Sequence, residues 1–176
     1  MMDEKAILNC METRRSVRSY LPDAVPTEKL DRILNAGLYA ASGMGKQSAI
    51  ILCVTDKRMR DRLMRMNAAV MGLDGKDPFY GAPCVLVVLA DRGVPTHVYD
   101  GSLVLGNMML AAHAEGLGSC WIHRAREEFD SDEGKAILRE LGVEGDYEGV
   151  GHLIIGYTDG AEPEAKPRRD GRILRV

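Results

Sequence analysis

The sequence lacks the short motifs that identify several well-known enzyme classes. It has no GxxxxGK[ST] phosphate loop, and neither 43–48 (GMGKQS) nor 116–121 (GLGSCW) completes GxGxxG, because the third glycine is missing. There is no HExxH and no Cys/His cluster to bind a metal, and no GxSxG to form an esterase elbow. The sequence therefore offers neither a conventional metal site nor a conventional nucleophile.

Strong charge and long apolar runs are also absent. The net charge of −3 argues against nucleic acid as the main partner, and no run approaches the ~20 apolar residues of a membrane span. Residues 1–12 are charged and lack the apolar core of a signal peptide. The four cysteines are scattered without a CxxC, which favours a reducing compartment. We expect a cytoplasmic protein that binds neither membranes nor nucleic acid.

What is present is an ordinary globular composition, with 45% hydrophobic and 28% charged residues, and a length suited to a single domain over 1–176. Apolar runs predict strands at 48–54, 84–90 and 151–157. Periodic patterns predict helices at 4–14, 57–66 and 132–141. Another predicted helix is capped by Thr27 and has an inward-facing apolar stripe of Leu30, Ile33, Leu34 and Leu38. The connections vary in length, which favours an α+β sheet packed by helices over a regular doubly wound fold.

The chain is organised around residues 99–123. From Leu103 to Ala114 nearly every residue is apolar or small, which predicts a buried central helix with Asp100 or Ser102 as its N-cap. A helix that is apolar on all sides must be covered on all sides, and a chain of 176 residues can cover it only in part. We therefore expect a second copy of the protein to cover the rest.

Three local features could bind a ligand. The arginines of 14–18 (RRSVR) can grip a phosphate bidentately, although a solvated helix end is the alternative. The tail stretch 166–169 (KPRR) is basic, although it could be only a charged terminus. The glycines of 42–47 (SGMGKQ) would let backbone amides approach a flat ligand, although an ordinary turn has the same composition.

Taken together and in this order, these stretches resemble the nitroreductase family of flavin enzymes. The resemblance lies in RRSVRSY (14–20), ASGMGKQS (41–48), YGAPCVLVVLAD (80–91), DGSLVLGNMMLAAHAEGLGSCWIH (100–123), GHLIIGY (151–157) and KPRR (166–169). No single stretch is specific, but six in the right order and spacing are. The resemblance implies a mostly antiparallel central sheet packed by helices, in an intertwined homodimer with FMN at the subunit interface.

The resemblance also implies which residues bind FMN. Its phosphate and ribityl chain are expected at Arg14, Arg15, Ser16 and Arg18, joined from the tail by Lys166, Arg168 and Arg169. The partner subunit's flavin is expected against Ser42, Gly43, Met44, Lys46 and Gln47. The flavin ring is expected along Cys120, Trp121, Ile122 and His123, with the backbone N–H of His123 near N5 and no catalytic side chain.

The family's chemistry would pass electrons from NAD(P)H to a small acceptor, such as a nitroaromatic compound or a quinone, by a ping-pong mechanism. The alternatives are a dehalogenating or flavin-fragmenting relative, a flavin-binding regulatory module without turnover, and a dimeric scaffold without a ligand. The chain departs from many members in the glycine loop, where Ala41, Gly45 and Ser48-Ala49 replace Pro, Asn and the Pro-Trp that follows Gln. It is also short, so the substrate pocket should be more open or lined by a loop predicted over 67–80. In that loop Asn67 and Lys76 are candidates for the pyrimidine edge of the flavin.

Overall fold

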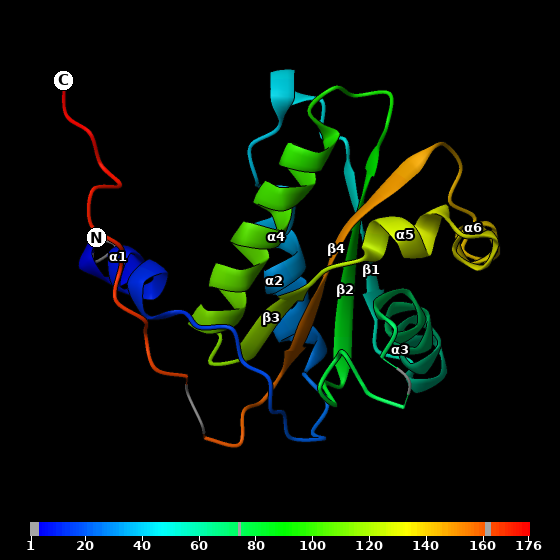
Figure 1. The fold of residues 1–176 in the computed structure, drawn as a ribbon, viewed down its shortest axis with the longest axis horizontal. Coiled ribbons are helices and arrows are strands. Elements are labelled where there is room, and N and C mark those ends of the chain that lie inside the picture. The colour runs from blue at the N-terminus through cyan, green and yellow to red at the C-terminus, as the bar shows by residue number, and fades with distance from the viewer. Residues whose placement is uncertain (1–3, 74, 161–162) are drawn as a thin grey trace.

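The computed structural model describes residues 4–73, 75–160 and 163–176. At its centre is a four-stranded sheet in the order β1-β2-β4-β3, in which every neighbouring pair is antiparallel (Figure 1). The strands are β1 (Ala49–Val54), β2 (Cys84–Asp91), β3 (Gly118–Ile122) and β4 (Tyr147–Gly156). The predicted α+β architecture around an antiparallel sheet is confirmed.

Helices cover both faces of the sheet. On one face lie α2 (Thr27–Leu38) and α4 (His97–Ala114), and on the other lie α3 (Lys57–Met71), α5 (Ala125–Asp130) and α6 (Asp132–Glu140) (Figure 1). Neighbouring residues of β2 therefore point into different apolar clusters: Leu86 and Val88 face α2 and α4, whereas Val87 and Leu89 face α3 and α5. This explains why the run that forms β2 is continuously apolar.

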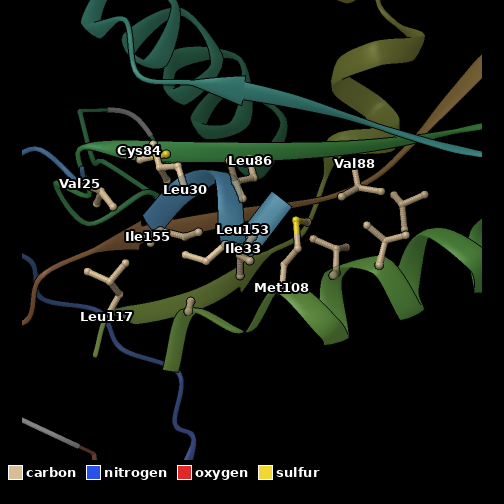
Figure 2. Packing of buried hydrophobic residues seen from close by; sticks show 14 of the residues in the cluster. Val25, Leu30, Ile33, Cys84, Leu86, Val88, Met108, Leu117, Leu153 and Ile155 are labelled. Carbon is tan, nitrogen blue, oxygen red and sulfur yellow. The ribbon is translucent and has the colours of Figure 1, made fainter. Parts of the chain in front are cut away.

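Figure 2 shows the cluster on the side of α2 and α4. Ile33 from α2, Met108 from α4 and Leu153 from β4 are fully buried in it. The two helices approach closely because α2 has glycine at position 37, where a Cβ would lie 2.8 Å from the Met108 Cγ. This packing fixes α4 across the sheet and so fixes what lies at its two ends.

Three predicted boundaries are wrong. Thr27 is the first residue of α2 rather than its cap, and Pro26 precedes it. α3 continues to Met71, because Ala68 extends its buried face, and ends where Gly72 adopts a left-handed conformation. Residue 67 is therefore helical, although the sequence had predicted a loop. β4 starts four residues before the predicted strand, at Tyr147.

The start of α4 also differs from the prediction. The helix begins at His97 with Thr96 in the cap position, so neither Asp100 nor Ser102 is its N-cap. Asp100 lies in the first turn and uses its carboxylate to accept hydrogen bonds from the preceding loop region. The short helix α5 was not predicted at all. Its six residues are too few to show a periodic pattern.

One side of α4 is uncovered in the single chain. Tyr99 and Leu103 are 72% and 50% exposed. Further along, α4 and α1 (Glu4–Thr13) border an apolar groove of about 430 Å³ that exposes Ile7 and Met11. Leu38, which was predicted to face inward from α2, is 65% exposed. The described chain thus leaves part of its central helix open, as the sequence predicted.

Candidate functional site

The arginine segment, residues 14–18, runs from the end of α1 along the edge of β3. Ser16 forms a parallel bridge with Ser119, and the Val17 N–H donates to the Ser119 carbonyl at 3.0 Å. Gly118 permits this approach, since a Cβ there would lie 3.1 Å from the Val17 Cβ. Val17, which is 5% exposed, anchors the segment and leaves arginines on either side of it.

Arg14 has a buried guanidinium nitrogen, Nη1, without a hydrogen-bond partner in the described chain. It lines a cavity of about 110 Å³ together with Arg15, His113 and Ser119. The Arg15 Nη1 already donates to the carbonyls of Glu12 and Arg14, at 2.6 and 2.7 Å. A buried cationic donor without an acceptor costs free energy. The cavity therefore suits an anion.

The positive charge of the arginine segment reaches Cys120 in β3. Burial raises the pKa of the Cys120 thiol above its ordinary value. The positive charge of Arg18, a hydrogen bond with Ser16 and the positive charge of Arg14 act in the opposite direction but are outweighed. Cys120 and Ile122 are only 1% and 8% exposed. Of the predicted ring-contact residues, these two therefore face the interior in the single chain, whereas Trp121 is partly buried and His123 is exposed.

The chain turns sharply after β3. Arg124 has a φ of 82°, which is uncommon for a residue other than glycine. Within residues 4–73, 75–160 and 163–176, neither the His123 N–H nor the Arg124 N–H has a hydrogen-bond acceptor. The segment lies close to β4 because β4 has glycine at 151, where a Cβ would lie 2.4 Å from the Trp121 Nε1. Two free amides can donate to the edge of a polar ring.

The glycine loop, residues 42–47, lies against the start of α4 and contains a 3-10 turn at Gly43–Gly45. Position 43 accepts only glycine, because a Cβ would lie 2.2 Å from the Thr96 Oγ1. The Asp100 carboxylate accepts from the Gly43 N–H at 2.9 Å and from the Ser48 hydroxyl at 2.7 Å. Hydrogen bonds to a buried carboxylate thus fasten the loop to α4.

The loop presents outward three residues that the resemblance assigns to a flavin. Met44 is 83% exposed, and Lys46 and Gln47 are also exposed. Met44 and Gln47 have positive φ angles of 52° and 48°. Ser42 is engaged within the loop, where its hydroxyl accepts from the Gln47 N–H at 3.0 Å. Such backbone strain concentrates where chains contact ligands.

The glycine loop and the arginine segment lie at opposite ends of α4 (Figure 1). The loop contacts Thr96 and Asp100 at the start of the helix, whereas the cavity of Arg14 includes His113 near its end. A helix of 18 residues is about 27 Å long at 1.5 Å per residue. The single chain therefore does not bring the two groups of predicted site residues together.

The tail does not join either group in the described residues. Lys166, Arg168 and Arg169 are exposed, and no hydrogen bond or ion pair links them to the arginine segment there. Ile173 and Leu174 are 77% and 87% exposed. The convergence of the tail on the same phosphate stays a prediction.

The structure reveals a buried polar cluster that the sequence did not predict. It comprises Asn67, Glu128 and His152, which are at most 1% exposed. Asn67 was expected at the flavin edge, but its side chain is enclosed and donates to the His123 carbonyl at 2.8 Å. The available signal was the presence of Asn67 and His152 within otherwise apolar stretches. Lys76 is exposed, and its predicted contact is untested.

No group of three or more His, Cys, Asp or Glu side chains in the described residues could hold a metal ion. Among the helices described, none combines the length and apolar character needed to cross a bilayer.

Comparison with known proteins identifies the family. The sequence profile described as the nitroreductase family matches residues 11–157. The chain belongs to the nitroreductase family. A protein of Methanothermobacter thermautotrophicus, provisionally named NADH dehydrogenase/NAD(P)H nitroreductase, is 30% identical over 119 residues, which cover 65% of this chain and 59% of that protein.

Solved nitroreductase structures share the fold over nearly the whole chain. A nitroreductase from Bacteroides fragilis with bound FMN superimposes with a TM-score of 0.87 at 30% identity, covering 97% of this chain and 98% of the other. An FMN-dependent nitroreductase from Clostridium difficile gives a TM-score of 0.72 at 31% identity, covering 94% of each chain. The resemblance read from the six stretches is thus confirmed at the level of family and fold.

Proposed function

We propose that this nitroreductase-family protein is an FMN-dependent oxidoreductase that passes electrons from NAD(P)H to a small acceptor, such as a nitroaromatic compound or a quinone. The observation that carries the proposal is the buried, unpartnered Nη1 of Arg14, beside Arg15 in a cavity that suits an anion. The phosphate of FMN carries close to two negative charges, which several guanidinium donors can neutralise. The relative from Bacteroides fragilis binds this same cofactor.

The residues present fit the rest of the cofactor. Arg14, Arg15, Ser16 and Arg18 would hold the phosphate and ribityl chain, and the free N–H groups of His123 and Arg124 would donate to the edge of the ring. When bound, FMN supplies the electron transfer between NAD(P)H and the acceptor. The protein then needs no acid, base or nucleophile of its own. Its residues bind and orient the cofactor, and NAD(P)H and the acceptor use one exposed face in turn.

The proposal includes a second copy of the chain, because one chain cannot complete the site. Met44, Lys46 and Gln47 lie at the far end of α4 from Arg14, so they would meet the flavin held by the partner. The same arrangement would cover the apolar side of α4 around Leu103, which is 50% exposed in the single chain. An apolar helix face and an incomplete site thus favour the same homodimer.

Colour is the simplest test of the cofactor. The protein is purified without added flavin, its visible spectrum is recorded, and any flavin released by heating is identified. We expect the absorption bands of an oxidised flavin and release of FMN. A colourless protein that also fails to bind added FMN would refute the proposal.

Turnover separates the proposed activity from the alternatives. NADH or NADPH oxidation is followed with a nitroaromatic or quinone acceptor, using protein reconstituted with FMN. We expect steady-state oxidation that depends on the acceptor. If neither nicotinamide reduces the bound flavin, a regulatory module without turnover is favoured instead. If the flavin is reduced but only a halogenated substrate reoxidises it productively, the dehalogenating alternative is favoured.

A further inference from the structure

Three polar side chains from three different elements meet inside the layer formed by α3, α5 and β4. Asn67 and His152 are 0% exposed and Glu128 is 1% exposed. Their surroundings are apolar, and the ring of His152 lies 5.3 Å from that of Phe79. Burying polar side chains among apolar ones costs free energy unless they are paired. The cluster therefore needs an explanation other than core packing.

The amide of Asn67 connects the cluster to the candidate site. Its Nδ2 donates to the Glu128 Oε1 at 2.5 Å and to the His123 carbonyl at 2.8 Å, so both amide protons are used. The other carboxylate oxygen of Glu128 lies 3.2 Å from the His152 Nε2. Glu128 thus holds the Asn67 amide in the orientation that reaches the backbone after β3.

This hydrogen bond sets the direction of one peptide group. The peptide between His123 and Arg124 is trans and planar, so its carbonyl and its N–H point in opposite directions. Since the carbonyl points inward to Asn67, the Arg124 N–H points away from the buried cluster, and it has no acceptor in the described part of the chain. The φ of 82° at Arg124 is unfavourable by itself and needs support from neighbours.

We propose that Asn67, held by Glu128, is a positioning residue that fixes the His123–Arg124 peptide so that its N–H donates to the flavin edge. The inference rests on the proposed FMN site and deepens it. Asn67 is enclosed and does not touch the flavin itself. By accepting a hydrogen bond, the His123 carbonyl also polarises its peptide and makes the N–H a stronger donor. Reduced flavin carries more negative charge than oxidised flavin, so it gains most from that donor.

The test compares Asn67→Leu, which has a similar volume but no amide, with Leu63→Ala. Leu63 lies one turn earlier in α3 and is 1% exposed in the same apolar cluster, but it is not bonded to the segment after β3. Leu63→Ala therefore controls for general loss of stability. Glu128→Gln is a second comparison, because its amide oxygen can still accept from Asn67.

The first readout needs no cofactor. Trp121 is the only tryptophan of the chain and lies two residues before His123, so its fluorescence reports on this segment in the apoprotein. We expect Asn67→Leu to increase quenching of Trp121 by acrylamide, whereas Leu63→Ala and Glu128→Gln leave it near the wild-type value. Unchanged quenching in Asn67→Leu, in a protein with a native circular dichroism spectrum, overturns the inference.

The second readout is the bound cofactor. We expect Asn67→Leu to weaken FMN binding roughly three- to tenfold, as for one neutral hydrogen bond, and to make the flavin midpoint potential more negative. Leu63→Ala should leave the potential unchanged. A wild-type potential and affinity in Asn67→Leu would overturn the positioning role even if quenching increases. Wild-type protein that binds no FMN at all would instead overturn the proposed function, so the two failures are distinguishable.

Discussion

At the scale of single residues, Arg14 is the strongest indication of an anion-binding site. Its Nη1 is buried and unpartnered in the described chain, whereas the Nη1 of Arg15 is engaged by two carbonyls. Val17 and the Ser119 carbonyl fix the backbone on its C-terminal side. The backbone of the segment is therefore fixed before a ligand binds, which reduces the ordering needed when a phosphate binds.

Replacing Arg14 should weaken FMN binding specifically. One charged hydrogen bond is worth about 1.5–3 kcal/mol, so Arg14→Ala should raise the FMN dissociation constant roughly ten- to a hundredfold. Titration of the apoprotein with FMN, followed by quenching of flavin fluorescence, measures this. Arg58→Ala, at an exposed position on α3, is the control and should bind as the wild type does. Equal dissociation constants in the two variants would contradict the assignment of Arg14 to the phosphate.

The sequence could reveal some of these residues and not others. The arginines of 14–18 form a local cluster whose spacing is visible without a structure. Asn67, Glu128 and His152 lie far apart in the chain. The Asn67–Glu128 hydrogen bond and the proximity of His152 to Glu128 exist only because α3, α5 and β4 pack together. Asn67 was expected at the flavin edge because the predicted helix ended at residue 66, whereas α3 continues to Met71 and buries Asn67.

At the scale of elements, the join between the glycine loop and α4 depends on the charge of Asp100. Burial alone would raise the pKa of Asp100. Hydrogen bonds from the Gly43 N–H and the hydroxyls of Ser48 and Thr96 outweigh that effect, so its pKa lies below the ordinary value. The unfolded chain therefore binds the proton more tightly than the folded chain. The stability that ionised Asp100 contributes is present above the unfolded pKa, about 3.9, and is lost as pH falls through the folded pKa.

Asp100→Asn should expose this dependence on pH. At neutral pH the variant should lose roughly 1–3 kcal/mol of unfolding free energy, because the NH2 of its side-chain amide faces donors and cannot accept from them. The difference from wild type should shrink as the pH approaches about 3. Urea unfolding across this range measures it. Asp23→Asn, exposed before α2, is the control and should show no such trend. A difference that stays constant with pH would contradict the role given to the carboxylate.

The side of α4 that the single chain leaves open predicts an interface. Leu103→Glu should leave the folded single chain intact, since Leu103 is 50% exposed, but should dissociate a dimer that buries it. Burial of a leucine contributes about 1.5–3 kcal/mol, and the change occurs twice in a symmetric dimer. Leu141→Glu is a matched control, because Leu141 is also 50% exposed but caps α6 on the other face of the sheet. Sedimentation should show a monomer only for Leu103→Glu.

The elements themselves were partly predictable. The run that forms β2 and the helix α4 were recognised because unbroken apolar stretches have few other interpretations. The helix α5 was missed, since its six residues follow the turn at Arg124 and are held by contacts with β4 such as Gly149 against the Ala125 carbonyl. The pattern of apolar residues along the sequence does not reveal a contact between residues so far apart in the chain.

At the scale of the whole molecule, the length of α4 links cofactor binding to assembly. The proposed phosphate residues and the glycine loop lie at opposite ends of this 18-residue helix, which is about 27 Å long. Each proposed flavin site therefore takes residues from both copies. A ligand that contacts both subunits binds the dimer more tightly than the monomer, and by linkage it must also stabilise the dimer.

FMN should consequently shift the monomer–dimer equilibrium. Dilute apoprotein, examined by sedimentation near its dimer dissociation constant, should contain a larger dimer fraction after FMN is added, and riboflavin, which lacks the phosphate, should have a smaller effect. The reciprocal measurement uses Leu103→Glu, whose separated chains keep Arg14 but lose the partner's Met44 and Gln47. This variant should bind FMN more weakly than wild type although its arginine segment is unchanged. Equal FMN affinity in the monomeric variant and the wild-type dimer would show that one chain suffices for the site, since linkage then leaves no coupling between the cofactor and the second copy.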